Sequence, residues 1–542
     1  MLFRALMTGA FFFTMISAAS PQSVDPTIFA HSVNRQMEDR VKGYAFAIAN
    51  KNKVVAEAAG GWAQAPRDGN LRMSARIPAG WGSNQKVLSG IALLDLLERR
   101  NMPLQQSLDT PMRFFVPDRW IQAYFNQPFR EGLSLITLRD LLDHTSALPQ
   151  EKDGGSHGTR IARALFEGNS AISHSRNERE YNNHNYTLML YIIPALANPG
   201  AVDRIEREAE GLSLRDYNRR VAREYGRLYT RYMHDIFLSQ IPGVNGSCQP
   251  GNFPGNRFAK EYNSRTDMRG ETDNAAHFCR SQGSWFYSAR DMANIHRTIE
   301  FTNTFVKRST RRLYRVKASG PRMIYWRTYR HDVLSTEVGQ GFRAHGGLTR
   351  FGTTSVSIRL PFGHVGVGIA NSREMNVDQL ANVMLAAFYE ATRTKFEQQT
   401  NRPGQDIRDF TQLAPDPQIC ADACANRADC QSWTYVLPGE QHPIAARCWL
   451  KSATPAPREA EHAVSGIKGA QYNTDRPGAN LRFQTIGRDD PALCRLLCTA
   501  ETDCKSWTFV PSGGQGPEPR CWLKRETPGP IRALGLVSGI VR

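Results

Sequence analysis

The stretch YAFAIANKNKVVAEAAGGW (Tyr44–Trp62) decides the fold class of most of this 542-residue chain. Two apolar runs flank a polar Asn-Lys-Asn-Lys turn, and this pattern predicts a β-hairpin. Further along, FRAHGGLTRFGTTSVSIRLPFGHVGVGIANS (Phe342–Ser372) predicts two or three more strands, and a helix is predicted behind them at 376–393. Because strands at both ends enclose a helical middle, we expect an α+β fold with one antiparallel sheet built from the two ends of residues 25–398.

The last third of the chain is an internal repeat. Four residues of the first copy recur 74 residues later, so that Cys420, Cys424, Cys430 and Trp433 correspond to Cys494, Cys498, Cys504 and Trp507. After a one-residue deletion, Cys448 is matched by Cys521. Each copy combines a Cys-x-x-x-Cys pair at helical spacing with a Ser-Trp-Thr strand and a Cys-Trp-Leu-Lys strand. A unit this small buries too little apolar surface to fold unaided, so we expect disulfides to stabilise it.

The repeated residues resemble the four-cysteine form of the PAN/apple module. The resemblance implies two such modules, at residues 406–469 and 480–542, which bind carbohydrate or protein and are not catalytic. Four cysteines per module allow three connectivities. The resemblance favours the disulfides Cys420–Cys448, Cys424–Cys430, Cys494–Cys521 and Cys498–Cys504.

The N-terminus and the cysteines predict an exported protein. Residues 1–19 combine a basic Arg4, an apolar run and small residues at 17–19, which is the pattern of a cleavable secretory signal peptide. No later stretch has the roughly 20 apolar residues of a transmembrane helix. The even number of cysteines predicts disulfides, with Cys248 and Cys279 as the remaining pair. Zinc binding is disfavoured because no Cys-x-x-Cys or His-Glu-x-x-His motif occurs, so we expect a periplasmic or secreted protein without metal or cofactor.

The composition is that of a globular protein with a basic surface. Hydrophobic residues make up 41% of the chain and charged residues 22%, which excludes a disordered or fibrous protein. The net charge of +17 favours an anionic partner such as nucleic acid, anionic lipid, an acidic wall polymer or an acidic protein, unless it reflects only an arginine-rich surface. The basic stretch Phe301–Asp332 superficially suits nucleic acid. In an exported protein we expect instead a solvated face or a contact with an anionic envelope polymer.

A candidate nucleophile lies in AGWGSNQKVLSG (Ala79–Gly90), where Lys86 follows Ser83 by three residues. Apolar residues then recur at helical spacing, at Val87, Leu88, Ile91, Leu94 and Leu97. Ser83 is therefore expected at the start of a buried helix, where serine commonly acts as a cap, with Lys86 one turn on beside it. A buried lysine can lose its proton and then accept the proton of the serine hydroxyl. A second match, Ser465–Lys468, lies in the repeat, whose other copy has Val541 in place of the lysine, so we expect no chemistry there.

Two later motifs contain the partners that such a nucleophile needs. Tyr181 and Asn183 form a Tyr-x-Asn motif before an apolar helix, and a tyrosine at such a turn can present its phenol to a cleft. His345, Gly346 and Gly347 lie on a predicted edge strand. Glycines there allow a ligand to approach the backbone closely, and the strand's N–H groups can bind an acyl group.

The order Ser-x-x-Lys, Tyr-x-Asn, His-Gly-Gly resembles the penicillin-recognising serine hydrolases, in the branch of the class C β-lactamases and serine esterases. The stretch ITLRDLLDHTSALP (Ile136–Pro149) is also similar to a segment of that family. The resemblance covers most of residues 25–398. It implies a β-lactamase/transpeptidase-like antiparallel sheet flanked by helices, with a helical subdomain.

The same resemblance implies a role for each motif. Ser83 is then the acylated nucleophile, with Lys86 as its base or proton relay. Tyr181 passes the proton to the leaving group and later activates water. The backbone N–H groups of Ser83 and Leu348 form an oxyanion hole, and Asn183 also hydrogen-bonds Lys86. The substrate-binding residues are then Asn183, His345, Gly346, Gly347 and Leu348.

One departure affects the expected substrate. β-Lactamases and DD-peptidases usually carry lysine where this chain has His345, and a largely neutral imidazole meets a substrate carboxylate less well at pH 7, unless Arg343 or Arg350 compensates. We therefore expect an esterase or a D-amino-acid amidase or peptidase, acting on an envelope-derived ester or amide and docked by the PAN-like modules. The alternatives are a β-lactamase or DD-carboxypeptidase, and an inactive protein of this fold that binds envelope glycan or protein.

Overall fold

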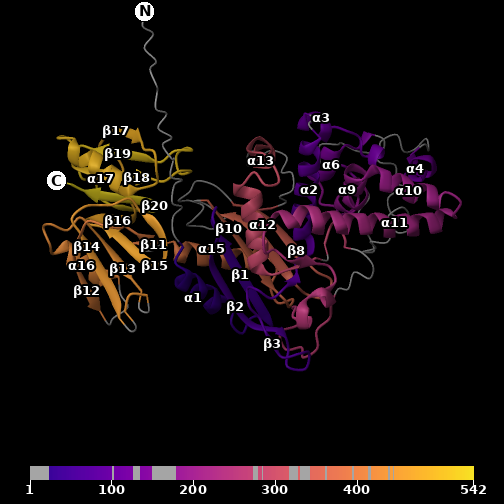
Figure 1. Cartoon of the computed structure of the whole chain (residues 1–542), viewed down its shortest axis with the longest axis horizontal. Helices are drawn as coiled ribbons and strands as arrows, with labels where there is room; N and C mark the ends of the chain where they lie inside the picture. Colours follow the sequence, from indigo (N-terminus) through magenta and orange to yellow (C-terminus); the bar gives the residue numbers. More distant parts are fainter. Residues whose placement is uncertain are drawn as a thin grey trace, which may run out of the picture. The chain divides into compact units, whose positions relative to one another are not determined.

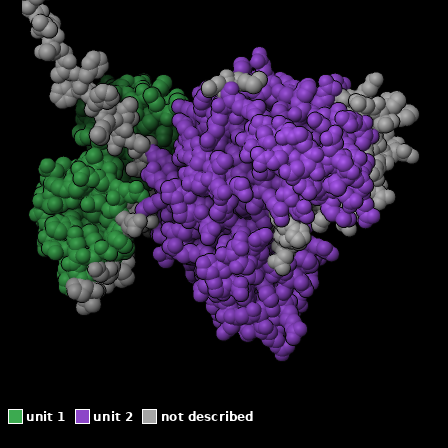
Figure 2. Space-filling model, turned by 45° about the vertical axis from the view of Figure 1, so that its right-hand side comes forward, with its two compact units in different colours: residues 1–23, 392–542 green, residues 24–391 purple. Residues whose placement is uncertain are grey.

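The computed structural model describes residues 24–100, 103–125, 135–148, 179–272, 279–283, 285–315, 327–329, 342–360, 363–392, 396–412, 417–437, 440–442 and 445–541. The predicted signal peptide and most of the second half of the basic stretch lie outside these residues. The chain divides into two compact units, residues 24–391 and 392–542 (Figure 2). In the described part of the chain, no helix has the length and apolar character needed to cross a membrane.

A seven-stranded antiparallel sheet lies at the centre of the first unit, in the order β3-β2-β1-β10-β9-β8-β7 (Figure 1). Its strands are β1 (Gly43–Ala49), β2 (Val54–Gln64), β3 (Leu71–Arg72), β7 (Arg327–Tyr329), β8 (Phe342–Leu348), β9 (Thr354–Leu360) and β10 (His364–Ala370). The hairpin β1–β2 and the strands β8, β9 and β10 are those predicted from the sequence. Phe46 of β1 is in register with Gly368 of β10, so the two ends of the unit meet in the middle of the sheet. The predicted α+β fold is confirmed.

Helices cover both faces of this sheet. α1 (Pro26–Met37) and α15 (Val377–Ala391) pack together, and both contact sheet strands, whereas α12 (Ala289–Phe301) packs against β1 and β10. Every residue of β1 is buried as a result. α15 is the helix predicted at 376–393. α1 begins at a side-chain cap, because the Asp25 carboxylate accepts the backbone N–H groups of Thr27 and Ile28.

The middle of the chain forms a helical subdomain beside the sheet (Figure 1). Its main helices are α2 (Gln85–Arg99), α9 (Met189–Ala197), α10 (Pro199–Ala209) and α11 (Leu214–Arg231). Shorter helices are α3 (Leu104–Leu108), α4 (Asp118–Trp120), α6 (Leu138–Asp143), α8 (Asn183–Thr187) and α13 (Arg308–Arg315). α9 packs against both α2 and α11. A small sheet has the strand order β4-β6-β5, with β4 (Ala79–Gly80), β5 (Gly246–Ser247) and β6 (Phe286–Tyr287). Its strand β4 ends just before Ser83.

The second unit consists of two copies of one five-stranded antiparallel sheet with a helix. The first copy contains β11 (Glu397–Asn401), β12 (Asp406–Gln412), α16 (Gln418–Ala425), β13 (Ser432–Val436), β14 (Ala446–Lys451) and β15 (Arg458–Ile467). The second contains β16 (Ala470–Asp475), β17 (Asn480–Thr485), α17 (Pro491–Ala500), β18 (Ser506–Val510), β19 (Arg520–Lys524) and β20 (Ile531–Ile540). The expected boundaries at 406 and 480 leave out β11 and β16. Each of these strands pairs with the last strand of its own copy.

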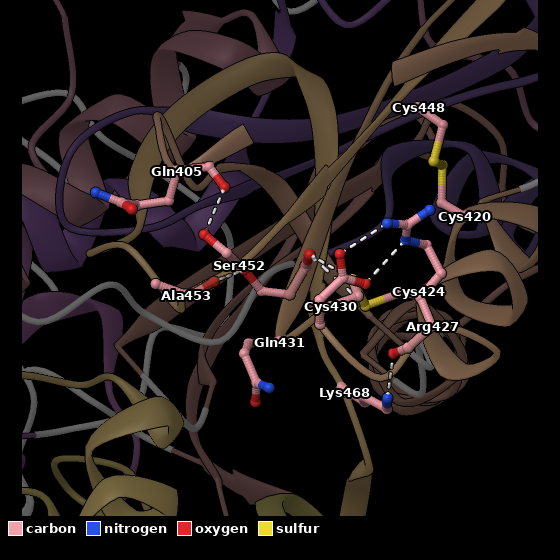
Figure 3. Close-up of a disulfide and its surroundings, with 12 residues drawn as sticks. Gln405, Cys420, Cys424, Arg427, Cys430, Gln431, Cys448, Ser452, Ala453 and Lys468 are labelled. Atoms are coloured by element: carbon pink, nitrogen blue, oxygen red, sulfur yellow. Dashed lines mark hydrogen bonds and ion pairs between the residues drawn. A yellow bond between two sulfur atoms is a disulfide. The ribbon is translucent and has the colours of Figure 1, made fainter. Parts of the chain in front are cut away.

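Disulfides join the helix of each copy to its sheet, with the pairing that the resemblance implied. The bonds are Cys420–Cys448, Cys424–Cys430, Cys494–Cys521 and Cys498–Cys504, with Cys248–Cys279 in the first unit. Figure 3 shows the first two, with Lys468 beside Arg427. The glycine of each Ser-Gly-Ile strand is also explained, because a Cβ atom on Gly466 would lie 2.5 Å from the Trp433 ring.

Candidate active site

Ser83 and Lys86 lie next to each other at the edge of the helical subdomain. Ser83 is in the short 3₁₀ turn η1 (Gly82–Asn84), and Lys86 is in the first turn of α2. Lys86 Nζ is 2.9 Å from Ser83 Oγ and donates a second hydrogen bond of 3.1 Å to the Gln282 carbonyl oxygen. Lys86 is fully buried and Ser83 is half-buried. The amine is therefore held against the hydroxyl and away from water.

The structure corrects the expectation that Ser83 caps this helix. α2 begins at Gln85, its N-cap residue is Asn84, and no side chain makes a capping hydrogen bond there. Ser83 lies one residue too early for this role because the 3₁₀ turn η1 is inserted before α2. Its hydroxyl group contacts Lys86 instead.

Strand β9 holds the turn that carries Ser83. Asn84 is fully buried, and its side-chain amide donates to Ser355 Oγ while its carbonyl accepts from Ser357 Oγ, both at 2.8 Å. Ser355 Oγ in turn donates to the Trp81 carbonyl oxygen at 2.8 Å. These three bonds fix the backbone on both sides of Ser83. The position of Ser83 therefore depends on strand residues more than 270 positions away in the sequence.

A second set of bonds fixes the carbonyl group that Lys86 contacts. Ser281, the residue before Gln282, donates through its Oγ to the Tyr186 carbonyl oxygen at 2.7 Å. Its own carbonyl oxygen accepts from Ser89 Oγ at 2.6 Å. Sequence reasoning missed Gln282, because its contribution is a backbone carbonyl, which any residue type can supply.

The backbones of η1 and β8 approach each other where glycines remove the side chains. A Cβ atom on Gly347 would lie 2.1 Å from the Trp81 carbonyl oxygen and 3.1 Å from the Ser83 nitrogen. A Cβ atom on Gly82, which has φ +51°, would lie 2.9 Å from the Leu348 nitrogen. The N–H groups of Ser83 and Leu348 thus lie on adjoining backbone segments, and the first N–H groups of a helical turn have no partner within it. The two N–H groups predicted to form an oxyanion hole therefore belong to backbone segments in close contact.

Tyr181 lies over the buried amine. Lys86 Nζ is 5.1 Å from the centroid of the Tyr181 ring. The same ring is 4.8 Å from the ring of His144 and 6.3 Å from that of His345. Tyr181 is half-buried. The structure therefore brings the tyrosine of the second motif and the histidine of the third to the predicted nucleophile.

His345 is almost completely buried, at 2% exposure, and its tautomer follows from its surroundings. Its Nδ1 lies 2.7 Å from the Gly346 carbonyl oxygen. A carbonyl oxygen only accepts, so Nδ1 carries the proton in this arrangement. The neighbouring Gly346 leaves room for α15, because a Cβ atom there would lie 2.3 Å from Val377.

His144 is a site residue that was not singled out from the sequence, although it lies in the stretch ITLRDLLDHTSALP. It is in a left-handed conformation (φ 59°) and is 3% exposed. Its Nδ1 accepts the backbone N–H of Asn182 at 3.1 Å. Burial, together with the positive charge of Lys86, lowers the pKa of His144 to about 2, so the ring is neutral. It packs against Tyr181 as an uncharged support.

Asn183 is the first residue of α8 and is half-buried. Among the described residues its side chain makes no hydrogen bond to Lys86, and its role in binding substrate stays a prediction. The neighbouring Asn182 caps α8 by accepting the His184 N–H at 2.9 Å, and it donates to the Leu148 carbonyl oxygen.

Over the described part of the chain, no three His, Cys, Asp or Glu side chains are grouped as ligands for a metal ion.

Comparison with known proteins identifies two kinds of domain. The Beta-lactamase family model matches residues 29–210, and the PAN domain model matches 400–451 and 474–524. Coagulation factor XI of Bos taurus is 28% identical over 164 residues, which is a quarter (25%) of this chain and a quarter (25%) of that protein. The octameric penicillin-binding protein homologue from Pyrococcus abyssi is 17% identical, with a TM-score of 0.49 over 66% of this chain and 76% of that chain. A class C beta-lactamase from Rhodobacter sphaeroides is 14% identical, with a TM-score of 0.46 over 67% of this chain and 98% of that chain.

Proposed function

Because the Beta-lactamase family model matches residues 29–210 and two PAN domains follow, we propose that the protein is an exported serine hydrolase that forms an acyl-enzyme on Ser83. The observation that carries the proposal is the 2.9 Å contact between Lys86 Nζ and Ser83 Oγ, beside the backbone of Leu348. A hydroxyl next to an amine and an oxyanion-binding backbone is what acyl transfer needs. The five disulfides support an oxidising compartment.

In the proposed reaction, Lys86 first gives up a proton to solvent, and its amine then accepts the Ser83 proton as Oγ attacks the carbonyl carbon of the substrate. The N–H groups of Ser83 and Leu348 bind the developing oxyanion. When the tetrahedral intermediate collapses, Tyr181 delivers a proton to the departing alcohol or amine, and the acyl group stays on Ser83. Water then attacks the acyl-enzyme with the Tyr181 phenolate as the base, and Lys86 returns its proton to Ser83 Oγ as the acid leaves, which restores the Ser83 hydroxyl. Each proton lost by one group is gained by another, so no cofactor is needed.

The surroundings of His345 favour an ester or amide substrate over a β-lactam or a DD-peptide. Its ring is buried, and Nδ1 is directed at the Gly346 carbonyl oxygen. An imidazole held in this way offers a substrate carboxylate no permanent positive charge, unlike lysine. We therefore propose an esterase or a D-amino-acid amidase or peptidase that acts on an envelope-derived substrate.

The second unit contains a cavity that suits the docking role of the PAN domains. Its volume is about 560 Å³, within the range of ligand sites. The lining includes residues of both copies, among them Asp422, Trp433, Lys468, Asn473 and Ile531. Amide and charged groups beside an aromatic ring suit a carbohydrate or a peptide. We propose that this cavity holds the polymer or partner that carries the substrate.

The proposal is tested with a fluorophosphonate probe and a panel of p-nitrophenyl esters, D-amino-acid amides, β-lactams and D-Ala-D-Ala peptides. Labelling and turnover are expected for the wild-type protein and not for Ser83→Ala. Ser465→Ala is the matched control, because it removes the serine of the other Ser-x-x-Lys stretch and should leave both unchanged. If wild type and Ser83→Ala show equal labelling and turnover, the proposal is wrong. If neither reacts while envelope glycan still binds, the protein is a binding protein of this fold.

A further inference from the structure

A row of arginines runs along the exposed side of α11. Arg215, Arg219, Arg223, Arg227 and Arg231 occur at every fourth position, and all five are exposed. Each step of four residues turns about 40° further round the helix axis, so these side chains form one inclined ridge that winds about 160° round the helix over about 24 Å, at 1.5 Å per residue. The opposite side of the helix is buried in the subdomain through Tyr217, Val221, Tyr225 and Tyr229. We call these five arginines the arginine ridge.

Few acidic groups neutralise the arginine ridge. α11 contains six arginines against two carboxylates, Asp216 and Glu224. Glu224 pairs with Arg223 at 2.9 Å and Arg227 at 3.1 Å. Asp216 pairs with Arg219 at 3.7 Å. Pairs this exposed contribute little to stability and exchange readily with other anions. Arg215 and Arg231 form no ion pair with any described residue.

The arginine ridge ends in a cavity of about 500 Å³, large enough for a sugar ring and its substituents. Arg227 and Arg231 belong to both the ridge and the cavity lining. The lining also includes His234, Asp235, Asn245, Asn252 and Trp285. The lining carboxylate, Asp235, lies 3.0 Å from His234 Nδ1. The cavity therefore combines cations with neutral hydrogen-bonding groups.

From this continuity we infer that α11 and its cavity form a binding site for an acidic polysaccharide. One acidic sugar occupies the cavity, where Arg227 and Arg231 bind its anionic group and the amide side chains of Asn245 and Asn252 bind its hydroxyl groups. The following acidic groups of the chain bind along the arginine ridge. This site lies outside the proposed active site and does not depend on Ser83.

The observations favour a polysaccharide over two other anionic partners. A membrane-binding helix turns apolar side chains to the lipid, whereas the apolar side chains of α11 face the protein core. Single-stranded nucleic acid requires exposed aromatic rings on which bases can stack. The arginine ridge has none, and Trp285 is 1% exposed. A flexible chain with a charge on each repeat can instead follow an inclined row of cations that ends in a polar cavity.

Binding of the full-length protein to polygalacturonate, measured by biolayer interferometry, tests the inference. Neutral dextran, polyglutamate, single-stranded DNA and phosphatidylglycerol vesicles serve as competing probes. We expect binding to polygalacturonate that weakens with salt and exceeds binding to every other probe. Arg227→Ala/Arg231→Ala should lower the affinity about tenfold or more, since it removes two charged hydrogen-bond donors. Arg215→Ala/Arg219→Ala, at the far end of the ridge, should lower it by a smaller factor.

The matched control is Arg67→Ala/Arg76→Ala, which removes the same charge from two other exposed arginines of the first unit. It should change the affinity less than twofold, and all three double variants should keep the wild-type melting temperature. Equal losses in the control and the cavity variant would show that only net charge matters. Failure of the wild-type protein to bind polygalacturonate, or equal or tighter binding to polyglutamate, DNA or vesicles, would also overturn the inference. Ester hydrolysis measured in parallel should be unchanged in every variant, which separates this test from that of the proposed function.

Discussion

The two Ser-x-x-Lys stretches of this chain share a pattern and differ in everything around it. At Ser83 the pattern spans a 3₁₀ turn and the start of a helix, and Lys86 Nζ lies 2.9 Å from the hydroxyl. At Ser465 it lies at the end of β15, where the fully buried hydroxyl donates to the Thr400 carbonyl oxygen at 2.8 Å. There Lys468 Nζ donates to a backbone carbonyl oxygen at 2.6 Å. Positions three apart share a face of a helix but point to opposite faces of a strand, so only the first stretch brings amine and hydroxyl together.

The largest expected difference between the two stretches concerns the serines. Ser83→Ala should reduce kcat for any accepted ester by at least about a thousandfold, because it removes the nucleophile. Ser465→Ala should leave kcat within about twofold, since its hydroxyl bonds only within the first PAN copy. Steady-state kinetics on the best p-nitrophenyl ester measures both. Similar losses in the two variants would contradict the comparison.

The second expected difference between the two stretches concerns their lysines, Lys86 and Lys468. Lys86→Met should lower kcat by about a hundredfold to ten thousandfold, the usual range for a general base, while the apolar stem still fills the buried site. Lys468→Met should leave the rate of acylation unchanged. Single-turnover labelling with a fluorophosphonate reports acylation directly. Fast labelling of Lys86→Met would show that another group accepts the Ser83 proton.

The third expected difference concerns a glycine beside each stretch, Gly347 near Ser83 and Gly466 after Ser465. Gly347→Ala should lower kcat about a hundredfold to a thousandfold, as loss of an oxyanion contact does, because its Cβ would lie 2.1 Å from the Trp81 carbonyl oxygen. Gly466→Ala introduces a similar clash with Trp433 in the first PAN copy and should destabilise only that copy. The two variants are compared by kcat and by thermal unfolding. A normal kcat in folded Gly347→Ala would remove the support for Leu348 as an oxyanion donor.

The smallest effect concerns the pH dependence of the stability of the first unit, residues 24–391. Burial raises the pKa of Asp143, which is 4% exposed, to about 6. The unfolded carboxyl has a pKa near 3.9. Below that value both states are protonated and the residue has no effect. As the pH rises from about 4 to about 6, the unfolded state loses its proton first, so the free energy of unfolding falls.

Asp143→Asn removes this ionisation and should raise the free energy of unfolding above pH 6 by on the order of 2 kcal/mol, with little change at pH 4. Urea unfolding followed by tryptophan fluorescence between pH 4 and 8 measures the difference. The transition of the disulfide-containing second unit should not move. A stability difference that does not vary with pH would contradict the assignment of the raised pKa to Asp143.

Helices and strands that show a local pattern of apolar residues were predictable from the sequence, because such a pattern depends only on neighbouring residues in the chain. The two apolar runs of β1 and β2 and the helical spacing after Lys86 gave elements that the structure confirms. The Trp433–Gly466 contact could not be predicted in this way, since both residues are ordinary strand residues in the sequence. The strands β11 and β16 were also missed, because their sequences, EQQTN and AQYNTD, have no apolar alternation.

The sequence alone contained the motifs of the candidate site and their order along the chain, because a nucleophile, a base and close backbone approach require particular residue types. Their assembly depended on tertiary packing. Ser355 and Ser357 hold the Ser83 turn, the Gln282 carbonyl oxygen binds Lys86, and His144 supports Tyr181. Each of these contacts joins segments that are distant in the chain and uses groups that are common in any protein. Only the folded backbone brings such groups within hydrogen-bonding distance of Ser83 and Lys86.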